Sequence, residues 1–421
     1  MTAKTTNQDL AINGGTPFRT TPMPTRKLFG TAEKQAVVDL MDRAAREGSQ
    51  VMGYSGAMED RYCEQFCAMM GGGYADGVNS GSNAMYVALA ALELEPLSEV
   101  IVPPISDPGG VMPVGMLGCV PVAADAQPGS FNVSAREIEA VLTERTSAIV
   151  VAHIGGIPVN MGEVIELARS RGVPIVEDVA QAHGAKHRGQ LCGSFGDIAA
   201  FSTMFGKHHA SGGQGAIVYT RNEALYWNAR RYADRGKPFN LPDVTGNVAC
   251  SLNCNMDEIH AAIGEANLAQ LPEFVARRRE VALALQERCR NLEAVSLWTE
   301  DAGDEGVYWF LTLRLDLAKL SVSRERFTEA LVAEGIDAAM SGYPFFPVRM
   351  PWATERCPSC RRRTPCKLPD CAMERRQRTE LANATAFEAE SLRVIIHEGW
   401  TVDEADDLAK ALAKLESAYL R

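Results

Sequence analysis

One lysine in this sequence has the surroundings of a covalent catalyst. Lys207 lies in the glycine-rich stretch 201–215, between two short apolar runs that are typical of strands. Upstream of it, Asp178 ends another apolar run, 174–178. A lysine amine can form a Schiff base with a carbonyl cofactor, and a carboxylate can keep a ring nitrogen of such a cofactor protonated. The two residues together indicate a Schiff-base site.

A turn upstream of these residues has the features of a phosphate site. The stretch 79–83, Asn-Ser-Gly-Ser-Asn, opens a helix that the apolar pattern predicts over 82–94. Gly81 would let the backbone approach an anion, Ser82 could cap the helix, and the N–H groups at the helix start favour negative charge. An ordinary serine-capped helix has the same pattern, so the turn alone leaves both interpretations open.

Helices and strands alternate around these residues. The apolar patterns predict strands at 99–102, 148–154 and 173–177 and helices at 82–94, 134–142 and 161–171. Such alternation predicts a mostly parallel sheet with helices on both faces. Right-handed crossovers would bring the carboxyl ends of the strands, and with them Asp178, to one edge of the sheet.

The pattern changes beyond residue 253. Here we predict long helices at 256–271 and 274–290, a strand at 308–315, a helix at 324–334 and a final amphipathic helix at 403–420. These elements indicate a smaller α+β domain. We divide the chain into an N-terminal arm (1–30), a large domain (31–275) and a small C-terminal domain (276–421).

The composition is that of a folded, acidic protein. With 421 residues, of which 46% are hydrophobic, the chain can bury a large core. A net charge of −11 makes it a poor general partner for nucleic acid or anionic membranes. No apolar run approaches the roughly 18 residues of a membrane span, and residues 1–9 lack the apolar core of a signal peptide. We expect a cytoplasmic protein that binds neither nucleic acid nor membrane.

Four of the 11 cysteines cluster in the small domain, in an insert near 357–371. The other cysteines are scattered, and we expect them to be reduced. Thiolates gathered in so short a stretch suit tetrahedral Zn²⁺, and the basic neighbours would lower their pKa values. A metal-free loop with reduced cysteines is the alternative, so structural zinc is a hypothesis that rests on spacing alone. The clustered residues are Cys357, Cys360, Cys366 and Cys371.

The order and spacing of the motifs resemble the DegT-type sugar aminotransferases, over about residues 11–345. The resemblance is carried mainly by 177–184 (Glu-Asp-Val-Ala-Gln-Ala-His-Gly), 193–197 (Gly-Ser-Phe-Gly-Asp), Ser202 and Lys207. It implies a fold-type I enzyme that depends on pyridoxal 5′-phosphate (PLP). It also implies transfer of an amino group from glutamate or glutamine to a keto sugar or keto cyclitol, in the biosynthesis of a secondary metabolite or glycan precursor, by a homodimer.

The resemblance implies roles for the residues of the site. Lys207 would bind PLP covalently and then transfer a proton. The others would hold the cofactor: Asp178 at the pyridine nitrogen, Gln181 near the phenolic oxygen, Gly81, Ser82 and Ser202 at the phosphate, and Asn253 at the phosphate of the neighbouring subunit.

The sequence departs from the family pattern at three places. Asp107 occupies the position of the aromatic residue that usually stacks on the cofactor ring, so stacking must come from elsewhere or Asp107 contacts the substrate. Asn255 replaces the usual arginine of the subunit-crossing segment. The stretch 212–215 reads Gly-Gly-Gln-Gly in place of Gly-Glu-Gly-Gly.

Two other functions share this fold. The PLP-dependent sugar dehydratases carry histidine in place of the lysine, and the presence of Lys207 favours an aminotransferase. A catalytically silent regulatory protein would not need Lys207, Asp178 and Gln181 together. For Lys207 to act as a base, its pKa must fall well below the ordinary value of about 10.4. Burial or the positive charge of His208 and His209 could lower it, although these can equally be ordinary loop histidines.

Overall fold

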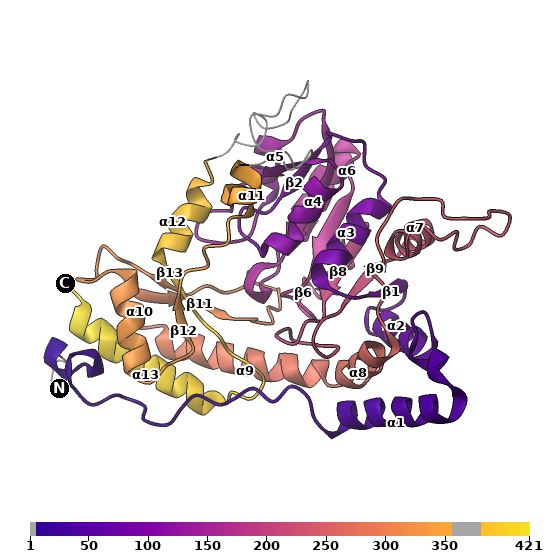
Figure 1. Ribbon diagram of the computed structural model, residues 1–421. Coiled ribbons are helices and arrows are strands. Elements are labelled where there is room, and N and C mark those ends of the chain that lie inside the picture. Colours follow the sequence, from indigo (N-terminus) through magenta and orange to yellow (C-terminus); the bar gives the residue numbers. More distant parts are fainter. Residues whose placement is uncertain (1–5, 356–379) are drawn as a thin grey trace.

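The computed structural model describes residues 6–355 and 380–421 and has two main sheets with helices packed against them (Figure 1). A short two-stranded sheet is formed by β6 (Lys186–His187) and β7 (Gln190–Leu191). The larger sheet has seven strands in the order β1-β9-β8-β5-β4-β2-β3. Only β9 runs antiparallel to its neighbours among these strands. The fold is α/β with a large, mostly parallel sheet, which confirms the predicted fold class. The strands are β1 (Tyr74–Val78), β2 (Glu99–Val102), β3 (Val120–Ala123), β4 (Thr146–Ala152), β5 (Ile175–Asp178), β8 (Ile198–Ser202) and β9 (Ala216–Thr220).

Helices cover both faces of the large sheet. Neighbouring strand residues such as Val100 and Ile101 point to opposite faces and belong to different core clusters. One face packs against α3 and α7, and the other packs against α2, α5, α6 and α8. Because both faces of the sheet are buried, its strands are continuous apolar runs in the sequence. The helices are α2 (Ala57–Met69), α3 (Gly81–Ala91), α5 (Ala135–Val141), α6 (Met161–Arg171), α7 (Glu223–Ala233) and α8 (Glu258–Leu268).

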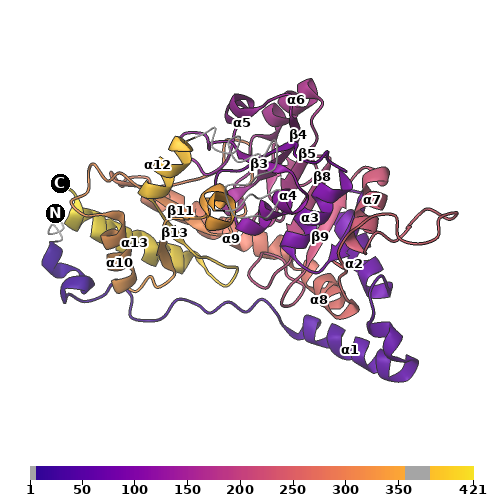
Figure 2. The ribbon, with the colours of Figure 1, turned by 45° about the horizontal axis from the view of Figure 1, so that its top comes forward.

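The smaller sheet is antiparallel, with the strand order β10-β11-β13-β12. Its core is shared with α9, α10 and α13. The proposed domain division at residue 275 falls inside α9, which connects the two sheets (Figure 2). The elements are β10 (Val295–Leu297), β11 (Leu311–Leu315), β12 (Ala339–Ser341), β13 (Ser391–Val394), α9 (Leu271–Cys289), α10 (Arg324–Ala333), α12 (Ala382–Glu390) and α13 (Val402–Tyr419).

The predicted elements differ from the observed ones mainly at their ends. The helix expected at 82–94 begins at Gly81, and its N-cap is Ser80, whose Oγ accepts a hydrogen bond from the amide of Asn83 over 3.2 Å. The expectation that Ser82 caps this helix is therefore wrong. A cap needs an extended backbone, which Ser80 has (φ −167°, ψ 158°), whereas Ser82 is already helical.

The N-terminal segment runs along the outer side of the helices that pack against the two main sheets. Figures 1 and 2 show it running from the helices of the small sheet to α1 (Thr31–Glu47). It is fixed to the segment after α10 because the amide of Arg19 donates to the carbonyl of Glu334 over 2.9 Å. Within the described ranges, none of the helices combines the length and apolar character that a membrane crossing needs.

Candidate active site

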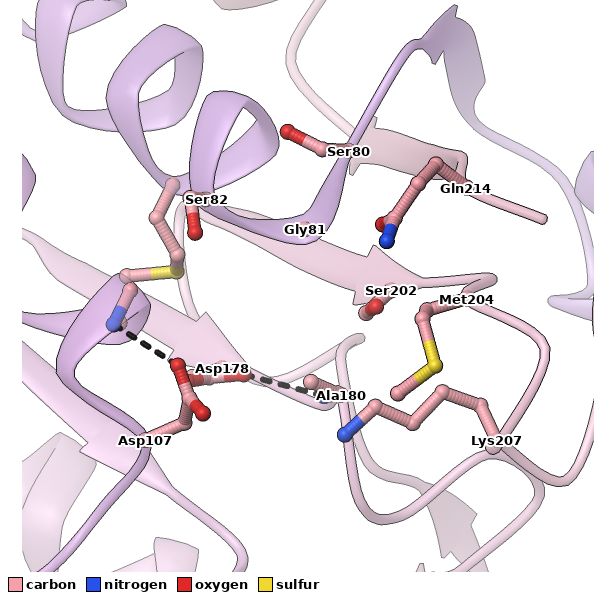
Figure 3. A pocket seen from close by; sticks show the side chains of 13 residues that line it. Ser80, Gly81, Ser82, Asp107, Asp178, Ala180, Ser202, Met204, Lys207 and Gln214 are labelled. Atoms are coloured by element: carbon pink, nitrogen blue, oxygen red, sulfur yellow. Dashed lines mark hydrogen bonds between the residues drawn. The ribbon is translucent and has the colours of Figure 1, made fainter. Parts of the chain in front are cut away.

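The carboxyl ends of two strands meet the start of α3 at one cavity of about 260 Å³. Asp178 ends β5 and Ser202 ends β8, and these strands pair in parallel, so both residues lie at the same edge of the sheet. Figure 3 shows Lys207 reaching into this cavity on the side of Asp178. The lining residues are Ser80, Gly81, Ser82, Met85, Asp107, Gly109, Gly110, Asp178, Ala180, Ser202, Met204, Lys207 and Gln214.

Lys207 is buried in the loop after β8, with 6% of its surface exposed. Its amide donates to the carbonyl of Met204 over 2.9 Å. Burial lowers the pKa of Lys207 to about 8, because the ammonium loses its hydration, while the carboxylates of Asp178 and Asp107 act in the opposite direction. The amine is therefore a stronger candidate for a base near neutral pH than an exposed lysine would be.

The N-terminal arm holds the lysine loop in place. Arg26 donates to the carbonyls of Lys207 over 2.6 Å and Phe205 over 3.2 Å, and its Nε lies 2.8 Å from Glu398 Oε1. Glu398 also pairs with Arg278, which is 1% exposed, over 3.0 Å. Sequence reasoning missed these residues, because the arm has no periodic pattern and the contacts join distant parts of the chain.

The carboxylate of Asp178 is buried at the opposite wall from the phosphate turn. Its Oδ1 accepts a hydrogen bond from the amide of Ala180 over 3.0 Å. Burial raises the pKa of Asp178, whereas that hydrogen bond and the charge of Lys207 oppose the shift. A Cβ atom on Gly110 would come within 2.6 Å of Asp178 Oδ2, so the glycine leaves the carboxylate room. A cationic ring nitrogen would be a suitable partner for this buried acid.

The other end of the cavity suits a phosphate. It combines the N-terminus of α3 with the hydroxyl groups of Ser80, Ser82 and Ser202. A Cβ atom on Gly81 would lie 2.7 Å from Ser202 Cβ and 2.8 Å from its Oγ, so only glycine lets these two elements approach. Exposed N–H groups, hydroxyl donors and the helix dipole together fit the phosphate of PLP.

The cavity lacks an aromatic ring among its described lining residues. At the position where the family pattern has one, Asp107 turns its carboxylate to the amide of Gly109, whose N–H donates to Oδ1 over 2.8 Å. The stretch 212–215, a second departure from the family pattern, places Gln214 at the cavity. The walls beside Lys207 and Asp178 are thus more polar than the resemblance implied.

Gln181 lies behind the cavity and not among its lining residues. It is buried, its Oε1 accepts from the amide of Gly155 over 2.8 Å, and its Nε2 donates to the hydroxyl of Tyr343 over 3.0 Å. These bonds fix the loop after β4 and the segment after β12 against β5. A contact of Gln181 with the phenolic oxygen of the cofactor stays a prediction.

Asn253 is exposed and lies outside the cavity lining. It pairs with Asp234 through a backbone bridge, and its Oδ1 accepts from Asn255 Nδ2 over 2.7 Å. The intervening loop after α7 extends away from the rest of the chain in both views (Figures 1 and 2). The predicted role of Asn253 requires a second subunit and stays a prediction.

The two histidines after the lysine do not supply positive charge to it. His208 and His209 are both buried. Burial lowers the pKa of His208 well below its ordinary value and that of His209 to about 4. Both rings are therefore neutral near pH 7, and burial of Lys207 itself is the main cause of its lowered pKa.

Cys357, Cys360, Cys366 and Cys371 lie outside the described residues. Within the ranges 6–355 and 380–421, no three histidine, cysteine, aspartate or glutamate side chains are arranged to hold a metal ion. The zinc hypothesis therefore stays at the level of the sequence.

The fold and the cavity agree with the comparison to known protein families. Residues 33–366 match the DegT/DnrJ/EryC1/StrS aminotransferase family. The chain belongs to this family, and it is an aminotransferase by class. The predicted resemblance is confirmed.

Individual relatives support this assignment. GDP-perosamine synthase from Escherichia coli O157:H7 is 30% identical over 317 residues, which cover 74% of this chain and 82% of the relative. L-glutamine:2-deoxy-scyllo-inosose aminotransferase from Streptoalloteichus tenebrarius is 31% identical over 369 residues, 84% of each chain. The crystal structure of an aminotransferase from Psychrobacter cryohalolentis superposes with a TM-score of 0.79 at 25% identity, covering 93% of this chain and 97% of that one.

Proposed function

We propose that this aminotransferase uses PLP to move an amino group from glutamate or glutamine to a keto sugar or keto cyclitol. The main observation in support is that Lys207, Asp178, Gly81 and Ser202 line the same cavity. An amine, a buried acid and a phosphate-binding helix start are the three groups that PLP chemistry requires of a protein. When bound, PLP supplies the electron sink for the transfer.

Each residue has a defined task in this proposal. The start of α3, with Ser82 and Ser202, would bind the phosphate of PLP. Asp178 would hold a proton at the pyridine nitrogen through its buried carboxylate. Lys207, once released as a free amine, removes and returns a proton at Nζ, for which a pKa of about 8 is suited. The arm residue Arg26 keeps the backbone of Lys207 fixed during this exchange.

The names of the relatives support the proposed substrates. One relative is named for the transfer from L-glutamine to a cyclitol ketone, and another for the synthesis of a nucleotide-linked amino sugar. The two proposed acceptor classes share a ring ketone. We therefore place this enzyme in secondary-metabolite or glycan-precursor biosynthesis, with the acceptor class open to test.

Half-reaction spectroscopy tests this function. Full-length protein loaded with PLP should show the absorbance of lysine-bound PLP, and L-glutamate or L-glutamine should convert it. Added keto cyclitol or nucleotide-linked keto sugar should restore it. Lys207→Ala should lack the initial absorbance. Absence of conversion with every donor would contradict the proposal, and a product that loses a hydroxyl group without gaining nitrogen would indicate a dehydratase.

We also propose that the enzyme works as a homodimer. The loop between α7 and α8 carries the exposed apolar side chains Val244, Val248 and Leu252 on a segment that extends away from the rest of the chain. A second subunit would cover this surface. Asn253 of one subunit would then contact the cofactor phosphate of the other. Light scattering of the purified protein checks the mass, and a monomer at micromolar concentration with full activity would contradict this part.

The zinc site and the cytoplasmic location are further parts of the proposal. The spacing of the four clustered cysteines supports zinc, and metal analysis of protein purified without added zinc decides between the ion and a metal-free loop.

The cytoplasmic location is supported by the remaining cysteines, none of which forms a disulfide within the described residues. Cell fractionation tests it.

A further inference from the structure

The side chain of Lys207 ends on the face of an indole ring. Its Nζ lies 3.8 Å from the centroid of Trp309, which lies two residues before the strand β11 of the small sheet. The residue is held by two hydrogen bonds, one from its ring and one from its backbone. Its Nε1 donates to the carbonyl of Gly206 over 2.9 Å, and the amide of Trp309 donates to the carbonyl of Gly155 over 2.8 Å. The ring therefore has one fixed orientation, with its face toward the amine.

No hydrogen bond or ion pair to Nζ is present within the described part of the chain, although Lys207 is almost fully buried. The charged groups that act on it from neighbouring elements are Asp178 at the end of β5 and Asp107 in the loop after β2. His183 also lies close, but burial lowers its pKa well below the ordinary value, so it is neutral. A buried ammonium needs a compensating interaction, and the indole face is the contact that the structure provides.

We propose that Trp309 is the positioning residue for the free form of Lys207, and that its ring receives the ammonium once the released amine has taken up a proton. The inference rests on the proposed function, since the amine of Lys207 is released and recaptured only where it carries the cofactor as a Schiff base. Protonated Lys207 would dock on the ring after it accepts the proton, and the neutral amine would leave the ring to recapture the cofactor. The indole thus keeps the proton that Lys207 has taken from the substrate close to the site until Lys207 returns it.

This role predicts an effect that simple packing does not. A cation–π contact stabilises only the protonated amine, so the ring must raise the pKa of Lys207 against the effect of burial. From the usual strength of such contacts, the contribution is roughly 0.4–1.5 pKa units. An indole that only fills space next to Phe310, whose ring centroid lies 5.5 Å away, would contribute to stability and leave the pKa of Lys207 unchanged.

The test measures the pKa of Lys207 in full-length protein freed of cofactor. The rate of acetylation of Lys207 by acetic anhydride is followed against pH by mass spectrometry of the peptide. Trp309→Leu and Trp309→Gln should lower the pKa by roughly 0.4–1.5 units, because both remove the ring. Trp309→Phe keeps a ring face and loses the bond to Gly206, and it should shift the pKa less. Trp298→Leu removes a different core indole, which packs on Phe131, and should leave the pKa unchanged.

A second measurement avoids any loss of folding. Incorporation of mono-, di- and trifluorinated tryptophan weakens the cation–π contact with little change in shape, and the pKa of Lys207 should fall stepwise with the number of fluorine atoms. A pKa that is the same in all fluorinated proteins and in Trp309→Phe would overturn the proposal. Neither measurement uses PLP or substrate, so its failure is distinct from a failure of the amino-transfer half-reactions.

Discussion

Arg26 of the N-terminal arm donates a hydrogen bond of 2.6 Å to the backbone carbonyl of Lys207. The same guanidinium pairs with Glu398, which in turn pairs with the buried Arg278 of α9. The arm, the lysine loop, the connecting helix and the small domain are thus joined through one group of charges. This arrangement makes the position of the lysine loop depend on a residue that lies far from it in the sequence.

Replacement of Arg26 should destabilise the protein and loosen the loop. Arg26→Ala removes the bonds to Lys207 and Glu398, and we expect a loss of about 1–3 kcal/mol in the free energy of unfolding. Urea unfolding measures it. Arg43→Ala is the control, because its pair with Glu47 is exposed and should contribute less than about 1 kcal/mol. Equal losses in both variants would contradict the assigned role of the arm.

The amino-transfer half-reaction should depend on the protonation of Lys207. The amine is a base only when neutral, and its pKa is about 8. Below that pH the single-turnover rate should therefore fall about tenfold per pH unit, and above it the rate should level off. Stopped-flow absorbance with L-glutamate from pH 6 to 9.5 gives the profile. A rate that is flat across pH 7–9 would show that a different group controls the proton transfer.

A methyl group at position 81 should weaken cofactor binding. In Gly81→Ala the new Cβ would lie 2.7 Å from Ser202 Cβ and force α3 and β8 apart at the phosphate end of the cavity. We expect at least about a tenfold rise in the Kd of PLP, the equivalent of about 1.4 kcal/mol. Gly213→Ala is a matched control, because a Cβ there meets no atom within 4 Å. Similar Kd values for both variants would count against the assigned phosphate site.

Loss of the Asp178 carboxylate should reduce the rate of the half-reaction more strongly than it reduces the affinity for PLP. Asp178→Asn keeps the size of the side chain and can still accept from the amide of Ala180, but it carries no charge toward the ring nitrogen. We expect the half-reaction to slow by about 10²–10³-fold. When the half-reaction is followed by absorbance at saturating PLP, a slower rate cannot result from weaker binding of PLP. A variant that binds PLP and turns over at the normal rate would exclude this acid from the mechanism.

Much of the site could be predicted from the sequence, for a physical reason. Alternating helices and apolar strands define a parallel sheet, and parallel strands with right-handed crossovers bring their carboxyl ends to one edge. Asp178 and Ser202 each end a strand, so this rule predicts that Asp178 lies at that edge, whereas the roles of Ser202 and Gly81 at the phosphate were implied by the family resemblance. The motif order around Lys207 then gave the family.

The tertiary structure decided what no local pattern encodes. Trp309 faces Lys207, and Arg26 binds its carbonyl, through contacts between parts of the chain that are distant in sequence. Burial, which depends on packing from every side, made His208 and His209 neutral and lowered the pKa of Lys207. The sequence by itself predicted which residues would hold the cofactor, because their motif order and spacing point to them. Only the folded chain determined their protonation and support, because these depend on neighbours that packing alone brings close.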